Sequence, residues 1–292
     1  MCTVTFIPRR EGYSLAMNRD ERIARGEALP PAVFEHGKVS AICAIYPRDI
    51  EGGTWIGGSA HGVSFALLNW NGPGLMHRKT RSRGSLIPTL ISADSSQDVH
   101  VTLSQMDLQG ILPFRLVGVF PTEEGVWEWR WDQSSLECER LPWSPRQWCS
   151  SSLSDSKASL IRRTAFDQFM HEVDVGSVAW MRRLHASHDP GHGPFSVCVH
   201  RGDVKTVSYT EMICTPTQVR CNYFPGSPCR SDQLEHSVST CRTFASTVRS
   251  PQASTAVNSL GAVVNYGEPD GESTFCFCGR TRSIDNVSLV GK

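Results

Sequence analysis

The cysteine at position 2 follows the initiator methionine directly and is the residue of this chain best placed for covalent chemistry. If Met1 is removed, Cys2 carries both a thiol and the free α-amine. An amine with a pKa of about 7.7 to 8.0 can accept the proton of a thiol with a pKa of about 8.5. Nucleophile and base then belong to one residue, as they do for an N-terminal threonine. Position alone does not separate this hypothesis from a chance Met-Cys start.

A polar cluster, Asn18-Arg19-Asp20-Glu21, follows two segments with strand-like alternation at residues 3–7 and 12–17. The turn at residues 9–12 predicts a hairpin, which returns this cluster to the side of Cys2. In that position Asp20 can hold the amine by a charge-assisted hydrogen bond. Arg19 can lower the pKa of the thiol or bind a substrate carboxylate. The alternative is a solvated turn with scattered charges.

Several further motifs accompany these residues, and together they are more specific than any one of them. They are Gly52-Gly53-Thr54-Trp55-Ile56-Gly57, the run from Gly62 to Leu67-Leu68-Asn69, residues 195–201, residues 205–209 and residues 223–229. With Met-Cys and Asn-Arg-Asp-Glu, they resemble the NRDE family, whose eukaryotic member is transport and Golgi organisation protein 2. That family is similar to N-terminal nucleophile hydrolases of the choloylglycine hydrolase and penicillin V acylase type. The resemblance covers residues 1–229.

The resemblance implies an α+β fold, a four-layer αββα sandwich with Cys2 in a cleft. In the related amidases, a cysteine attacks a carbonyl, and an arginine and an aspartate matched here by Arg19 and Asp20 support it. Their oxyanion-hole asparagine is matched by Asn69, and such a donor lowers the barrier by about 3 to 4 kcal/mol. A second asparagine has no match, because Ser150-Ser151-Ser152-Leu153 stands in its place.

The remaining site residues are assigned from the same motifs. An arginine that enters a helix in the amidases corresponds to Arg162 or Arg163. The predicted substrate-binding residues are Asn18, Trp55, Trp70 and Arg162, and Tyr13 and Phe65 are further candidates for the pocket lining because they lie near the motifs in sequence.

Length and charge exclude several classes of protein. The chain has 292 residues, long enough for one large domain, and its 29 Lys+Arg balance 29 Asp+Glu. This balance gives no global field to attract nucleic acid or an anionic membrane. No run reaches the roughly eighteen apolar residues of a membrane span, and no signal peptide is recognisable. We therefore expect a cytoplasmic protein with a small-molecule partner, and related hydrolases often form dimers or tetramers.

The eleven cysteines are interpreted as free thiols, since the expected compartment is reducing. Cys43 and Cys198 lie in apolar patterns that predict core positions, and Cys276 and Cys278 lack the second pair of a zinc site. A metal could be held by imidazoles and thiolates of one cluster: His185, His188, His192, Cys198 and His200. The irregular spacing of this cluster favours a loop with ordinary histidines, so we expect no metal or cofactor.

Periodicity supports the sandwich. Strands are expected at residues 39–46, 54–70, 113–120 and 125–131 and as a pair within residues 195–210, with helices at residues 85–91, 97–106, 158–172 and 177–185. The glycines at residues 57–62 indicate a hairpin turn and do not open a helix as a phosphate loop does. Trp127, Trp129 and Trp131 alternate on one face, which favours sheet packing over a ligand cleft. Residues 230–292 show strand hints only at 256–266 and 283–290, which predicts a loosely attached tail.

Two functions follow from these observations. The first is an N-terminal nucleophile amidohydrolase that cleaves a non-peptide C–N bond, such as an N-acyl amide, through an acyl-enzyme. The second is a non-catalytic carrier or chaperone that holds haem or an acyl lipid in the same cleft, as suggested by the association of the eukaryotic family member with haem and lipid handling. A hydrolase loses turnover in the Cys2→Ala variant, whereas a carrier tolerates it.

Overall fold

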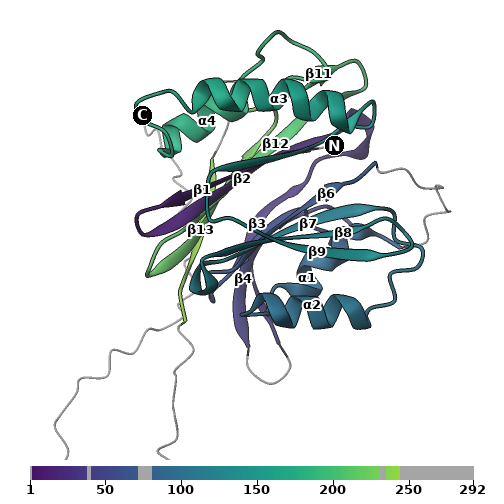
Figure 1. The fold of residues 1–292 in the computed structure, drawn as a ribbon, viewed down its shortest axis with the longest axis vertical. Coiled ribbons are helices and arrows are strands. Elements are labelled where there is room, and N and C mark those ends of the chain that lie inside the picture. Colours follow the sequence, from purple (N-terminus) through teal and green to yellow (C-terminus); the bar gives the residue numbers. More distant parts are fainter. Residues whose placement is uncertain (1, 38–40, 72–80, 231–234, 244–292) are drawn as a thin grey trace, which may run out of the picture. The chain divides into compact units, whose positions relative to one another are not determined.

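The computed structural model describes residues 2–37, 41–71, 81–230 and 235–243, and within them the chain forms two antiparallel sheets (Figure 1). The first sheet runs in the order β10-β1-β2-β12-β13-β14, with β11 paired to β12. Its strands are β1 (Cys2–Arg9), β2 (Gly12–Arg22), β10 (Arg146–Ser150), β11 (His200–Arg201), β12 (Val204–Cys214), β13 (Gln218–Pro225) and β14 (His236–Cys241).

The second sheet follows chain order from β3 to β9. Its strands are β3 (Leu29–His36), β4 (Ile42–Arg48), β5 (Ile56–Ser59), β6 (Ser64–Asn69), β7 (Phe114–Phe120), β8 (Gly125–Trp131) and β9 (Leu136–Leu141). The helices are α1 (Leu86–Leu90), α2 (Ser96–Gln105), α3 (Asp155–Phe169) and α4 (Val178–Ala186). Three short 3-10 helices, Ile23–Arg25, Arg83–Ser85 and Pro121–Glu123, complete the described elements.

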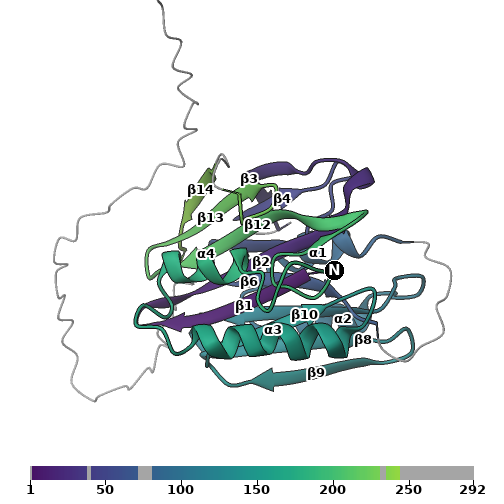
Figure 2. The same cartoon turned by 90° about the horizontal axis from the view of Figure 1, so that it is seen from above.

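Three apolar clusters join these elements into layers. One cluster lies between the sheets and combines Val4 and Leu15 of the first sheet with Leu68 and Val117 of the second. Another packs α1 and α2 on the outer face of the second sheet. The third packs α4 and the end of α3 on the outer face of the first sheet, where Figure 2 shows these helices lying over β1 and β2. The order of layers is therefore helix, sheet, sheet, helix, and the predicted αββα sandwich is confirmed.

The N-terminal hairpin has the predicted form. Alternation on β1 and β2 buries both faces, because one faces the second sheet and the other faces the helices. The turn requires Gly12, whose φ is +98° and whose added Cβ would lie 2.0 Å from the carbonyl oxygen of Cys214. In the resulting register Cys2 pairs with Arg19 on one side and with Ser150 of β10 on the other.

Most predicted elements occur with shifted ends, and the missed ones are strands. Strands β3, β9, β10 and β13 were not predicted. Their residues are partly polar and partly exposed and form no long apolar run. The tryptophans of β8 pack as predicted: Trp129 and Trp131 are buried in the cluster beneath α1 and α2. They do not line the cavity that contains Cys2.

The C-terminal boundary differs in one respect from the prediction. Strand β14 follows residue 229 and pairs with β13 from Gln218 to Tyr223, so the first sheet continues past the expected start of the tail. The strand hints at residues 256–266 and 283–290 lie outside the described residues, as do Cys276 and Cys278. Among the described residues, no helix has the length and apolar character that crossing a bilayer demands.

Candidate active site

One cavity contains the predicted catalytic residues. Cys2 is contributed by β1, Arg19 and Asp20 by β2, and Asn69 by the end of β6. The remaining lining residues come from β2 and the loops at this end of the two sheets: Glu21, Arg25, Asp49, Thr54, Trp55, Leu67, Ser82, Arg83 and Gly84. The sandwich thus brings together residues that are as far apart in sequence as positions 2 and 84.

The thiol of Cys2 is buried, with the residue 7% exposed. Burial is the largest influence on the pKa of Cys2 and raises it above the ordinary value, and the negative charge of Asp20 adds to this. The backbone N–H of Asp20 donates to the sulfur, and Arg19 also lowers the pKa, but neither reverses the effect of burial. The side chain is therefore a protonated thiol at neutral pH and needs a base to become a nucleophile.

Asp20 lies on the side of β2 that faces the helices, and its carboxylate is buried. The hydroxyl of Thr206 donates to Oδ1 at 2.7 Å, and Nη2 of Arg162 lies 3.4 Å from Oδ2. Burial raises the pKa of Asp20, while Arg162 and Thr206 oppose this rise. A β-bulge between Thr206 and Ser208 shifts the register of β12 beside Asp20 and Arg19.

Arg162 supports this arrangement from behind the sheet. Its guanidinium has no exposed surface and donates to the carbonyl oxygen of Cys2 at 3.1 Å and to the hydroxyl of Thr3 at 2.8 Å. Nε donates to the carbonyl oxygen of Ser196 at 3.0 Å. Arg162 does not line the cavity. Its described contacts are with Cys2, Thr3, Asp20 and Ser196, and the contact with substrate stays a prediction.

Three arginines line the cavity, and the sequence predicted only Arg19. The guanidinium of Arg19 lies over the ring of Trp55 at 4.5 Å, a cation–π contact that fixes both side chains. Arg25 pairs with Glu21 at 2.8 Å and with Asp49 at 3.4 Å.

Arg83 differs from the other two arginines because it has no carboxylate partner among the described residues. Its Nη1 donates to the carbonyl oxygen of Pro113 at 2.9 Å, and burial lowers its pKa. Arg83 reaches the cavity because the backbone at Gly84 packs directly against Gly53. A side chain on Gly84 would prevent this contact, since its Cβ would lie 2.8 Å from Cα of Gly53. The sequence held no signal for Arg83, because this contact joins two separate loops.

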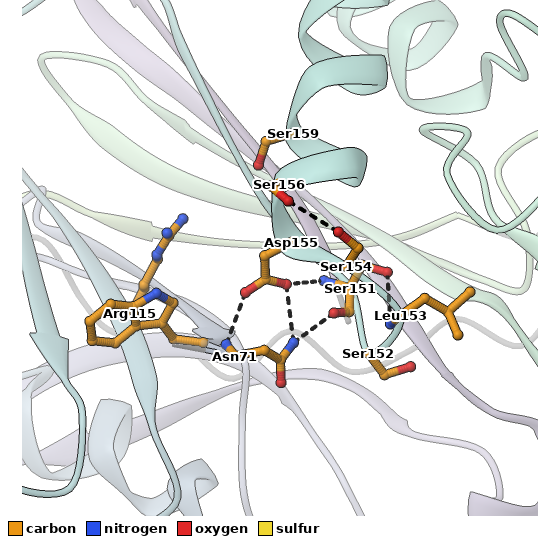
Figure 3. A pocket seen from close by; sticks show the side chains of 10 residues that line it. Asn71, Arg115, Ser151, Ser152, Leu153, Ser154, Asp155, Ser156 and Ser159 are labelled. Carbon is orange, nitrogen blue, oxygen red and sulfur yellow. Dashed lines mark hydrogen bonds between the residues drawn. The ribbon is translucent and has the colours of Figure 1, made fainter. Parts of the chain in front are cut away.

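Asn69, the last residue of β6, and Asn71, two residues later, have different surroundings. Asn69 lines the cavity, and its side-chain amide makes no hydrogen bond with other described residues. Asn71 lies in a neighbouring hollow, where Nδ2 donates to the carbonyl oxygen of Ser151 at 2.6 Å and to Oδ1 of Asp155 at 3.0 Å (Figure 3). Both protons of the Asn71 amide are used, so only Asn69 retains a donor for a ligand.

The other predicted pocket residues lie elsewhere. Asn18 is fully buried and donates to the carbonyl oxygens of His185 and Val197, so it ties β2 to the segments behind the sheet. Trp70 lines the hollow that contains Asn71. Tyr13 donates to Gly62 between the sheets, and Phe65 packs beneath α1 and α2. None of these four residues is among those that line the cavity.

The histidine and cysteine residues separate in space. His185 is buried and contacts the hydroxyl of Thr5 at 3.0 Å, away from the other imidazoles. His188, Cys198 and His200 lie together, and Cys229 joins them from the turn after β13. Cys198 is buried as predicted, whereas Cys43 is only partly buried. Sequence spacing did not indicate Cys229, because it is far from the others along the chain.

Comparison with known proteins identifies the first part of the chain. Residues 1–137 match the model of the family described as Transport and Golgi organisation 2. The match covers slightly less than half of the chain, and over these residues the chain is similar to that family. The family resemblance drawn from Met-Cys and Asn-Arg-Asp-Glu is thereby confirmed, and the motifs after residue 137 lie beyond the match. No curated protein matches the sequence.

Several solved structures are similar to the chain, each at 9% identity. Penicillin V acylase from Agrobacterium tumefaciens has a TM-score of 0.47 and covers 77% of this chain and 83% of its own. A variant of the conjugated bile acid hydrolase from Clostridium perfringens has a TM-score of 0.47, with 84% and 97% covered. The Caenorhabditis elegans orthologue of N-acylethanolamine-hydrolyzing acid amidase has a TM-score of 0.49, with 73% and 92% covered.

Proposed function

We propose that this protein hydrolyses a non-peptide C–N bond, as in an N-acyl amide, with Cys2 as the nucleophile. The observation that carries the proposal is the meeting of three side chains in one cavity, the Cys2 thiol, the Arg19 guanidinium and the Asn69 amide, with the backbone of Asp20 beside the sulfur. Each group supports a separate part of acyl transfer, and none duplicates another.

The proposed reaction starts with removal of Met1. The α-amine of Cys2 accepts the thiol proton, and the sulfur attacks the carbonyl carbon of the amide. The carbonyl oxygen becomes an oxyanion that accepts a hydrogen bond from Nδ2 of Asn69. As the C–N bond breaks, the protonated α-amine returns its proton to the leaving nitrogen. Water then attacks the thioester, giving a carboxylic acid and the free thiol.

Burial of the thiol supports the need for this internal base. Because burial raises the pKa of Cys2, few sulfurs are ionised at neutral pH without a proton acceptor beside them. Asp20 supports the role of the amine, since its backbone N–H donates to the Cys2 sulfur and its negative charge close to Cys2 would stabilise a protonated amine on that residue. Arg162 and Thr206 hold that carboxylate in place.

The charges on the cavity wall favour a polar substrate. Arg83 is a cation without a carboxylate partner among the described residues, so it can bind a carboxylate or another anionic group of the substrate. The arginines and carboxylates of the lining disfavour the second function, a carrier for haem or an acyl lipid, because an apolar ligand would desolvate them without replacing their hydrogen bonds.

Intact mass spectrometry and thiol labelling test the proposal. Purified protein should lack Met1, and iodoacetamide should label Cys2 faster than the other thiols at neutral pH. The Cys2→Ala variant should lose this rapid labelling and the hydrolysis of a panel of N-acyl amides. Cys149→Ala is the matched control, because Cys149 is buried on the adjacent strand and burial raises its pKa to about 11.

Retention of Met1, or labelling of Cys2 no faster than of Cys149, would refute the proposed role of Cys2 as the nucleophile. Hydrolysis that persists in Cys2→Ala would assign the reaction to other residues. Ligand binding that survives in Cys2→Ala, without hydrolysis in the unmodified protein, would support the carrier.

A further inference from the structure

Four side chains of metal-binding type meet behind the first sheet, outside the cavity of Cys2. They are His188, Cys198, His200 and Cys229, and one possible ligand atom from each lies within 4.8 Å of the others. Nε2 of His200 lies 3.6 Å from the sulfur of Cys198 and 3.3 Å from the sulfur of Cys229. Nε2 of His188 is buried and has no hydrogen-bond partner within the described part of the chain.

The two distances from Nε2 of His200 match a tetrahedral zinc site. Bonds of about 2.0 to 2.1 Å to nitrogen and about 2.3 Å to sulfur place neighbouring ligand atoms about 3.3 to 3.8 Å apart. Two thiolates and two imidazoles in this geometry are typical of zinc. We infer that His188, Cys198, His200 and Cys229 bind one structural Zn²⁺. All four positions are filled by protein, which is the arrangement of a structural site.

The donor set also suits a divalent cation. Imidazole nitrogen and thiolate sulfur are the ligands that zinc prefers, and a bound cation would compensate the charge of two neighbouring thiolates.

Zinc would hold a segment that lacks regular structure. Residues 187–199 connect α4 to β11 without a helix or strand. Three of the proposed ligands flank or belong to this segment, and Cys229 fastens it to the turn after β13. The turn is itself tied to β12, since the hydroxyl of Ser227 donates to the carbonyl oxygen of Thr206 at 2.7 Å.

The same segment contacts the residues that position Asp20. The N–H of Val199, between two proposed ligands, donates to the hydroxyl of Thr206 at 2.8 Å, and that hydroxyl donates to Asp20. Arg162 donates to Ser196, and Asn18 donates to Val197. A metal at the cluster would therefore stabilise the segment that holds Thr206, Arg162 and Asn18 in place behind the cavity. The inference does not depend on the proposed hydrolysis, because it rests on a different set of side chains.

Metal analysis of the full chain tests this inference. Protein without a polyhistidine tag, purified in reductant and supplied with zinc, should contain about one equivalent of zinc by mass spectrometry. Cys198→Ser and His200→Ala should lose it. The matched control is a variant with Cys241→Ser and His236→Gln, which removes one thiol and one imidazole from β14 in the same sheet.

Measurements on the unmodified chain test the inference even if the variants fail to fold. Co²⁺ in place of zinc should give thiolate-to-cobalt charge-transfer absorption, and zinc should protect Cys198 and Cys229 from alkylation until a chelator is added. Chelation should also lower the melting temperature and increase hydrogen exchange at residues 187–199. Less than about a tenth of an equivalent of zinc would overturn the inference. So would zinc retained in Cys198→Ser, or a Cys198–Cys229 disulfide formed in the presence of reductant.

Discussion

The buried pair of Arg162 and Asp20 gives a prediction whose size follows from the structure. Neither side chain has exposed surface, and Nη2 lies 3.4 Å from Oδ2. Replacing Arg162 by Met keeps much of its apolar volume and removes all of its N–H donors. The carboxylate of Asp20 then retains Thr206, while the carbonyl oxygens of Cys2 and Ser196 lose their donor. Removing one partner of a buried pair costs about 3 to 5 kcal/mol.

The loss should depend on pH, and its sign follows from Asp20. Burial raises the pKa of Asp20 in the folded protein, and Arg162 is the largest opposing influence, so Arg162→Met raises that pKa further. A carboxyl group whose pKa is raised by folding contributes stability that is fully present below its unfolded pKa of about 3.9. That contribution is lost as the pH rises through the folded pKa. The cost of Arg162→Met should therefore be greater at pH 7 than near pH 5.

Urea unfolding at the two pH values measures this cost, and a double variant isolates its cause. In Arg162→Met with Asp20→Asn no unpaired charge is buried, so the double variant should be more stable at pH 7 than Arg162→Met alone. Arg163→Met is the matched control, because Arg163 is exposed and pairs with Asp167 on the same helix. A cost below about 1 kcal/mol for Arg162→Met, or a double variant no more stable than the single one, would refute the reasoning.

Three further predictions concern single side chains. Asn69→Ala should lower kcat for N-acyl amides by about 10²- to 10³-fold with little change in KM, because the donor acts on the oxyanion; an equal rise in KM would contradict this. Arg83→Gln should raise KM for substrates that carry a carboxylate more than for their neutral amides, and equal effects on both would exclude Arg83 from recognition of the anion. Asn71→Ala should lower the free energy of unfolding by about 0.5 to 1.5 kcal/mol, measured in urea, because it removes the side-chain hydrogen bonds to the carbonyl oxygen of Ser151 and to Asp155, which keeps the backbone N–H donors of Asn71 and Ser151. No loss of stability would mean that water replaces these bonds.

The local part of the site could be predicted from the sequence. Alternation and a glycine turn specify the hairpin, and the hairpin alone sets the register that pairs Cys2 with Arg19 and places Asp20 next to the sulfur. Asn69 depended on the family motif as well, since periodicity places it at the end of a strand without showing what it faces. The helices that cover the sheets were predicted because apolar residues that recur with helical spacing indicate an amphipathic helix.

Strands with polar or partly exposed residues were missed, because hydrogen bonds and side-chain contacts with neighbouring strands stabilise them more than their own residue pattern does. Strand β10 is an example: its residues are partly polar, yet it pairs with β1 and borders Cys2. The same limit applies to β14, which forms where β13 offers an edge. Propensity in strands depends on these cross-strand contacts more than on the sequence of the strand itself.

Tertiary structure alone decided which distant side chains meet. Arg162 reaches Cys2 across 160 positions of the chain, and Cys229 reaches His200 across 29. Arg83 arrives at the cavity because two glycine-containing loops pack closely. The sequence determined the hairpin that begins with Cys2 and the class of fold, because periodicity and short turns act over a few residues. The surroundings of the buried Arg162, the placement of Arg83 and the metal-type cluster were decided by packing, because they depend on contacts between elements that no local pattern encodes.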